Sequence, residues 1–268
     1  MRVSTSERTL NYVVLTLFAL FAAFPVLTII TTAFSARIGE SGAFHPENFV
    51  AAWKIGGFGM SFVHSIVVAV IVVVTALVLS TLSGFAFGTM RFAGSTPLFY
   101  LFLIGLMIPS EAIVFPLFFD LRTIHLTDTY AAIALPQIAQ SIAFGTFWMR
   151  TQFRSMPVSM LEAAALDGAS PVRALVAVVV PAARPALVTL TVLMFLWTWN
   201  EFLIALVMSP SKALRTAPLG LANFQGQYTS ENALLAAGAI LVALPMVALF
   251  LVLQRHFIRG MLEGASKE

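Results

Sequence analysis

The protein has 268 residues, of which 59% are hydrophobic and only 10% are charged, and its mean hydropathy is +0.94. A soluble domain has about a quarter of its residues charged, and a soluble chain of this length could not bury so much apolar surface. Composition therefore excludes a soluble or a disordered protein and predicts an all-α, polytopic membrane protein. We attribute the net charge of +3 to arginines at the cytoplasmic face of a membrane and expect no nucleic-acid binding.

Six apolar stretches follow one another along the chain, and each is long enough to cross a membrane. One crossing of the hydrocarbon core needs about 20 apolar residues. The stretches cover residues 11–34, 61–88, 97–119, 130–149, 185–208 and 233–254. We therefore expect six transmembrane helices in a single transmembrane domain over residues 1–268, without a large soluble domain.

Two interpretations are open for the first stretch. Arg2 and Arg8 precede it, and small residues lie at its end over 33–36, as in a secretory signal peptide. Its apolar region is, however, about twice the length of the usual signal-peptide core. We favour an uncleaved first helix.

Positive charge predicts the orientation. If the N-terminus is inside, ten Lys and Arg residues lie in inner segments and five in outer ones. The inner ones are Arg2, Arg8, Arg91, Arg150, Arg154, Arg173, Arg184, Arg255, Arg259 and Lys267. This excess places both termini in the cytoplasm. It also makes the longest inner loop, residues 150–184, cytoplasmic.

The residue types needed for most catalytic or metal sites are missing or scattered. The chain has no cysteine, its four histidines lie far apart, and no lysine follows a glycine, so it lacks a Walker-type ATP site. A membrane enzyme would have to use four dispersed acids: Glu111, Asp120, Asp128 and Glu201. We therefore expect no catalytic, cofactor or metal site on this chain.

The inner loop contains signals for a helix, a turn and a second helix. The first helix can begin at Pro157, or at Ser159 through a capping box with Glu162. Gly168 is placed to end it in a left-handed turn. Ser170 and Pro171 then suit the N-cap and first position of the second helix.

Two prolines, Pro181 and Pro185, are expected to stop this second helix before the fifth stretch. The alanines at 163–165 leave one face of the first helix with little bulk, so a partner could approach it closely. We expect Glu162 and Asp167 at the edge of that face, available to a basic partner.

This loop resembles the EAA motif of ABC-importer permeases. Glu162–Ala164 is followed after three residues by Gly168, and Val178 and Val180 precede Pro181 where the family usually has Ile and Leu. The resemblance implies a coupling loop that docks on an ATPase. Its implied coupling residues are Glu162, Ala163, Ala164, Asp167, Gly168 and Pro181.

The similarity extends over nearly the whole chain, to the carbohydrate branch of these permeases. Its segments are Met107–Pro109, Pro116–Leu117, Asp128–Tyr130, Leu135–Pro136, Trp199–Phe202 and Gln254–Phe257 with Gly260. They are similar to the second, six-span subunit of maltose and multiple-sugar systems. One departure is His64 before Ser65, where the family often has Asn.

Four residues in the third and fifth stretches are candidates for a translocation path: Glu111, Trp197, Asn200 and Glu201. Glu111 lies about 21 Å into a continuous third span, and a charge at such depth usually faces a bundle interior or water. Pro109 should kink that helix. The two acids could instead form interhelical hydrogen bonds or reach the interface by snorkelling. Trp197 and Trp199 could be either residues of an interfacial aromatic belt or a platform on which a sugar stacks.

The resemblance implies a permease subunit of an ATP-driven ABC importer that moves a carbohydrate across the cytoplasmic, or inner, membrane of a prokaryote. Its implied partners are a homologous permease, two cytoplasmic ATPases that bind ATP and Mg, an extracytoplasmic sugar-binding protein and membrane lipid. Two alternatives are kept: an ABC permease for another small polar solute such as a polyamine, and a self-sufficient channel or secondary transporter.

Overall fold

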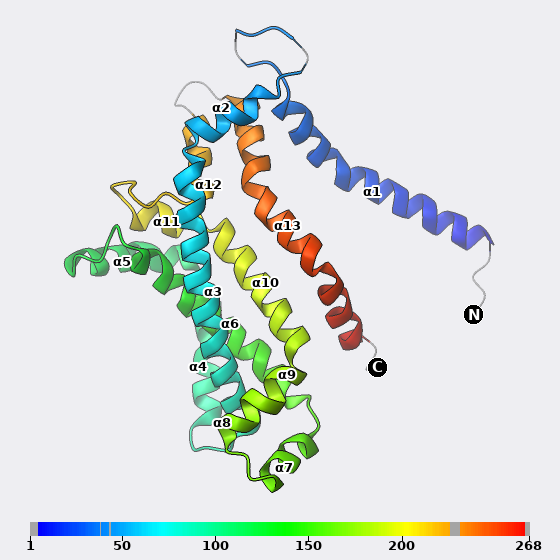
Figure 1. Ribbon diagram of the computed structural model, residues 1–268, viewed down its shortest axis with the longest axis vertical. Coiled ribbons are helices and arrows are strands. Elements are labelled where there is room, and N and C mark those ends of the chain that lie inside the picture. The colour runs from blue at the N-terminus through cyan, green and yellow to red at the C-terminus, as the bar shows by residue number, and fades with distance from the viewer. Residues whose placement is uncertain (1–4, 38, 43, 226–230, 266–268) are drawn as a thin grey trace. The chain divides into compact units, whose positions relative to one another are not determined.

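The computed structural model describes residues 5–37, 39–42, 44–225 and 231–265, and side chains from residue 7 to residue 254 within them. The regular elements of these ranges are all helical (Figure 1), which confirms the all-α prediction. They are α1 (Thr5–Ala33), α2 (Glu47–Ile55), α3 (Phe58–Thr89), α4 (Ser95–Met107), α5 (Ser110–Thr123), α6 (Tyr130–Arg154), α7 (Val158–Leu166), α8 (Pro171–Ala174), the π-helical turn η1 (Leu175–Val179), α9 (Val180–Ala182), α10 (Arg184–Asn200), α11 (Leu203–Met208), α12 (Ala217–Gly220), the 3-10 turn η2 (Leu221–Phe224) and α13 (Asn232–Ala265).

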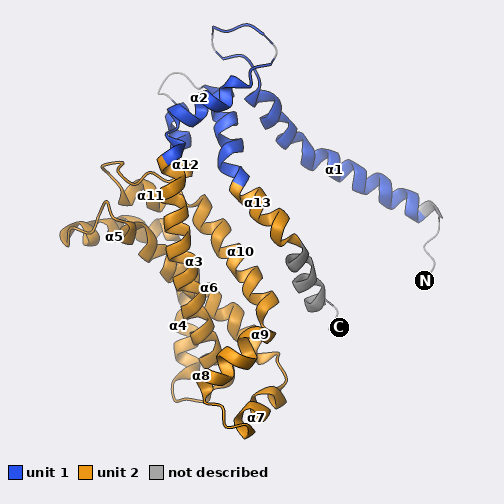
Figure 2. Ribbon diagram, in the orientation of Figure 1, with its two compact units in different colours: residues 1–59, 220–244 blue, residues 60–219, 245–268 orange. Residues whose placement is uncertain are grey.

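The chain divides into two compact units, coloured separately in Figure 2. The first unit comprises residues 1–59 and 220–244, and the second comprises residues 60–219 and 245–268. The tail motif after Gln254 lies within the backbone of α13, but its side chains lie outside the described residues. Arg2 and Lys267, which enter the charge count, lie entirely outside the described residues.

Three described helices are long and apolar enough to cross a membrane, over residues 7–33, 58–89 and 232–254. They match the first, second and sixth predicted stretches. Two bent helix pairs would raise the number to five if each pair is one span. The fourth stretch corresponds to α6, which at 25 residues is about 37 Å long but carries buried polar residues such as Gln137, Ser141 and Thr146.

The third stretch is not one continuous helix. Helices α4 and α5 meet at Ile108 and Pro109 and differ in direction by 95°. Both residues have extended backbone, with ψ of 119° and 135°, because proline has no N–H and disfavours a helical residue before it. The kink expected at Pro109 is therefore a full break between two helices.

The fifth stretch is also interrupted, in this case without a proline. Helix α10 ends at Asn200, Glu201 is extended with ψ of 120°, and α11 begins at Leu203. The backbone groups freed by such a break need new partners in an apolar environment. The side chain of Glu201 supplies one of them: its Oε1 accepts a hydrogen bond from the amide of Ile204 at 2.8 Å.

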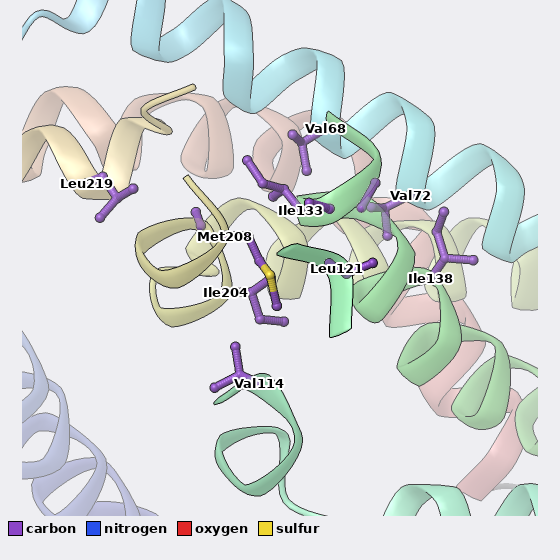
Figure 3. Close-up of a cluster of buried hydrophobic side chains, with 12 residues drawn as sticks. Val68, Val72, Val114, Leu121, Ile133, Ile138, Ile204, Met208 and Leu219 are labelled. Carbon is purple, nitrogen blue, oxygen red and sulfur yellow. The ribbon is translucent and has the colours of Figure 1, made fainter. Parts of the chain in front are cut away.

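A buried apolar cluster in the second unit holds α5 and α11, the short helices that follow the two breaks (Figure 3). It joins α3, α5, α6, α11 and α12. Its largest members are Val68, Val72, Val114, Leu121, Ile133, Ile138, Ile204, Met208 and Leu219. Since Val114 lies three residues after Glu111, and Ile204 three after Glu201, this packing also fixes the two glutamates.

Helices α3 and α6 cross closely in the second unit. A Cβ on Gly84 would lie 2.5 Å from Cβ of Met149 and 3.0 Å from the backbone nitrogen of Arg150. At the same crossing, the hydroxyl groups of Ser83 and Thr146 are 2.6 Å apart. Small residues and hydroxyl pairs of this kind let helix backbones approach in membranes.

We expect Gly84→Ala to destabilise the protein by about 1–3 kcal/mol, because the added methyl meets backbone atoms that cannot move aside. Gly59→Ala, in the same helix, is the matched control, since no described atom lies within 4 Å of its Cβ position. Thermal unfolding of the two purified variants in detergent is the measurement. Equal melting temperatures for both would contradict the close crossing.

The first unit is organised around Phe58, which is fully buried. Its ring lies 6.3 Å from that of Phe224. The side chain of Asn48, in the first turn of α2, donates to the carbonyl oxygens of Ala33 and Ser35 at 3.0 and 2.9 Å. In the loop between α1 and α2, the Arg37 guanidinium bonds the Glu40 carboxylate and holds the pKa of that carboxyl below its usual value. Polar side chains of the loop and of α2 thus hold this connection.

Candidate functional site

The predicted helix–turn–helix of the inner loop is present. Helix α7 begins directly after Pro157, which is its N-cap. Of the two starts left open, the structure therefore selects Pro157, and Ser159 lies inside the helix. In Figure 1 this segment lies at one end of the second unit, where α3 ends and α4 begins.

Gly168 closes α7 as predicted, with φ of +74°. The amide of Gly168 donates to the carbonyl of Ala165 at 3.0 Å, and that of Ala169 donates to Ala164 at 2.9 Å. These two bonds form a Schellman motif, which satisfies carbonyls left free at a helix end and favours glycine in the left-handed position. Ser170 then caps α8 by accepting from the amide of Arg173 at 3.3 Å, with Pro171 in the first turn.

Pro181 does not end the second helix at once. The helix widens into the π-helical turn η1 just before it, where the amide of Val180 donates to the carbonyl of Leu175. Because proline lacks an N–H and its ring displaces the carbonyl four residues earlier, a local change of helical pitch accommodates it. The chain turns by 81° after Ala182, before α10.

The surface of this segment differs in one respect from the expectation. Glu162, Ala163 and Asp167 are exposed, but Ala164 is only 6% exposed, because α7 packs on α8 and η1. Ala164 therefore belongs to the inside of the segment and not to its free face. Leu166 is 89% exposed, so the free face includes a large apolar side chain that the sequence did not single out.

A cavity of about 680 Å³ lies in the second unit, at the breaks between α4 and α5 and between α10 and α11. All four predicted path residues line it. The full lining is Gly105, Leu106, Ile108, Pro109, Ser110, Glu111, Gln137, Gln140, Ser141, Phe144, Leu196, Trp197, Thr198, Asn200, Glu201 and Met246. Polar and apolar residues far apart in the sequence are thus brought to one cavity.

Three side chains near the C-terminal end of α10 have different surroundings. The Nδ2 of Asn200 donates to the carbonyl of Leu196 at 2.8 Å and lies 3.4 Å from the sulfur of Met246. Trp197 is half-exposed and stands edge-on to Phe144, with ring centroids 4.8 Å apart. Trp199 is 1% exposed, so neither an interfacial belt nor a stacking platform describes it.

Four lining residues from α6 were not predicted: Gln137, Gln140, Ser141 and Phe144. They stand at positions i, i+3, i+4 and i+7, which form one face of a helix. A stripe of two amides and a hydroxyl in the middle of an apolar stretch was the signal that could have identified them. Gln137 is 6% exposed, so its amide is fixed in the cavity wall.

The segment Asp128–Tyr130 has a structural role outside this cavity. Asp128 adopts φ of +59°, and its Oδ1 accepts bonds from the hydroxyls of Ser209 and Ser211 at 3.1 and 2.6 Å. Thr129 caps α6. The hydroxyl of Tyr130 lies 2.6 Å from Nδ1 of His64. His64, which stands where the family often has Asn, therefore has a polar partner.

Within the described part of the chain, no three His, Cys, Asp or Glu side chains are placed to hold a metal ion. What the site offers is a helical segment with an exposed face at one end of the unit, and a cavity lined by polar and apolar side chains beside two broken helices. This is the architecture of a membrane transport component.

Comparison with known proteins identifies its family. The family model described as "Binding-protein-dependent transport system inner membrane component" matches residues 76–263. The chain therefore belongs to this family of inner-membrane permeases.

Two relatives and one solved structure are similar over most of their length. The trehalose transport system permease protein SugB of Mycobacterium tuberculosis is 34% identical over 82% of this chain and 81% of its own. The arabinooligosaccharides transport system permease protein AraQ of Halalkalibacterium halodurans is 32% identical over 93% and 92%. A bacterial ABC transporter involved in the import of the acidic polysaccharide alginate has a chain with a TM-score of 0.79, 24% identity and coverage of 96% and 99%. That last likeness is one of fold.

Proposed function

We propose that this chain is the permease subunit of an ATP-driven ABC importer that moves a carbohydrate across the cytoplasmic membrane. The observation that carries the proposal is the α7–α9 segment, whose Glu162–Gly168 turn is built as the EAA resemblance implies. Since the sequence has no phosphate-binding loop, ATP is bound by separate ATPase subunits. The names of the relatives, which refer to trehalose and arabinooligosaccharides, support a sugar as the solute.

The cavity beside Glu111 and Glu201 is the proposed path, completed by a homologous permease. An extracytoplasmic binding protein delivers the sugar to the outer loops. The α7–α9 segment docks on an ATPase through its exposed face, which includes Glu162 and Leu166. Six spans in a single transmembrane domain remain our expectation: the three long helices, α6, α4 together with α5, and α10 together with α11.

Deletion of this chain in its native cell should abolish accumulation of labelled neutral oligosaccharides, tested as a panel of trehalose, arabinotriose and maltotriose. Restoring the chain should restore uptake, and removing cellular ATP should stop it. Loss of polyamine uptake with sugar uptake intact would contradict the carbohydrate assignment. Uptake that persists without ATP would support a channel or secondary transporter instead.

We expect the N-terminus and residues 150–184 to face the cytoplasm. The chain contains no cysteine, so single cysteines report sidedness directly. In intact cells, an impermeant thiol reagent should label Ser41→Cys, Thr123→Cys and Ala213→Cys, all at exposed positions. Ala165→Cys, equally exposed, should react only after the cells are opened. Labelling of position 165 from outside would overturn the orientation and the coupling role together.

A further inference from the structure

We propose that the cavity excludes anionic solutes and admits neutral, hydroxyl-rich ones; this inference rests on the proposed function of the cavity as the path. Two carboxylates line it, Glu111 and Glu201. Among its described lining residues there is no lysine, arginine or histidine to balance them. The contribution of this chain to the cavity is therefore a negative potential.

The helix breaks strengthen this argument. Broken transmembrane helices often present the positive N-terminal end of a half-helix to an anionic group of the solute. Here both ends already hold a carboxylate of the chain itself. Glu201 accepts the amide of Ile204 at 2.8 Å, and Glu111 lies in the first turn of α5. A solute carboxylate would meet these glutamates instead of free backbone amides.

The rest of the wall suits an uncharged polar molecule. Gln137, Gln140 and Asn200 carry amides that both donate and accept hydrogen bonds. The rings of Phe144 and Trp197 stand next to each other at one side of the same cavity. Amides beside aromatic surface match a sugar ring, which presents hydroxyls at its rim and C–H groups on its faces.

The local charge can be measured without knowing the solute, because the chain has no cysteine. Gln140→Cys places one thiol in the cavity wall, at a position that is partly exposed. In the purified full chain, kept in its complex, this thiol is reacted with a cationic and with an anionic methanethiosulfonate reagent. The ratio of the two rates, divided by the same ratio for free 2-mercaptoethanol, reports the potential at the thiol.

We expect the cationic reagent to be favoured about tenfold, because two carboxylates without a balancing cation line the cavity. Adding Glu111→Gln and Glu201→Gln should bring the ratio close to one. Glutamine at 201 keeps a side-chain oxygen for the amide of Ile204, so α11 retains its cap. Asp120→Asn is the matched control, since Asp120 is an exposed acid of the same helix α5 that does not line the cavity, and it should leave the ratio unchanged.

A ratio near one for Gln140→Cys alone would overturn the inference while leaving a water-filled path intact. Failure of both reagents to react at this position, and also at Ser141→Cys, would show that no aqueous cavity exists there. That result would contradict the proposed path itself, so the two failures are distinguishable.

Discussion

Gly168→Val is expected to abolish transport and to weaken ATPase binding, while the chain still inserts into the membrane. Gly168 has φ of +74°, a conformation that costs an ordinary residue about 1–2 kcal/mol and a β-branched one more. No described atom lies within 4 Å of its Cβ position, so the strain is in the backbone and not in crowding. The chain can relieve it only by breaking the Schellman turn, which reorients α8 relative to α7.

Gly168→Asn is the control for this prediction, because asparagine tolerates the left-handed conformation. It adds a larger polar side chain at the same exposed position and should keep most of the transport activity. The measurement is ATPase co-purification together with sugar uptake at equal permease levels. Wild-type values of both for Gly168→Val would refute the assignment of this segment to coupling.

Replacing both Asn200 and Glu201 with leucine is expected to reduce transport at least about tenfold while the complex still assembles. Both side chains line the cavity, and leucine would remove their polar groups from the path. Leucine at 201 also removes the bond to the amide of Ile204, which leaves a buried donor unpaired at a cost of about 1–3 kcal/mol.

Glu201→Gln separates these two effects, since it removes the charge but keeps an oxygen that can cap α11. Uptake of a labelled neutral sugar by this variant should stay near the wild-type rate. Normal uptake by the double leucine variant would instead place the two residues away from the path, at the boundary with lipid.

The inner segment was predictable because its signals are local. Gly168 and Ser170 satisfy free backbone groups within a few residues, and Pro171 has no N–H that would need a partner. Their roles therefore depend little on the rest of the fold. Which alanine faces outward was not predictable. Ala163 and Ala164 are equivalent in the sequence, and only packing on α8 and η1 separates the exposed one from the buried one.

The helix breaks in the third and fifth stretches were harder to predict than the inner segment, because they depend more on tertiary structure. Pro109 marks the first, but a proline alone is compatible with a kink. Nothing in the local sequence requires α10 to end at Asn200; there the break is stabilised by the cap from Glu201 and by packing of Ile204 and Met208 in the apolar cluster. Apolar windows continue across both sites, so hydropathy predicts continuous spans.

Only part of the cavity lining could be predicted, because the rest of it also depends on tertiary structure. An acid in an apolar stretch is conspicuous, and so Glu111 and Glu201 were identified from the sequence. Gln137, Gln140 and Ser141 are uncharged, and their joint meaning depends on facing α10 across the fold. Their helical spacing is visible in the sequence, but only packing shows that this face of α6 meets the cavity.

The most direct test of the central claim is affinity purification of the tagged chain from its native membranes, with identification of what accompanies it and an assay of ATP hydrolysis. We expect a stable complex that contains a second, homologous permease and an ATPase, and that hydrolyses ATP. The Gly168→Val chain purified in the same way should lose the ATPase and retain the second permease. A chain that purifies alone, and that moves solute in liposomes without ATP, would contradict the account.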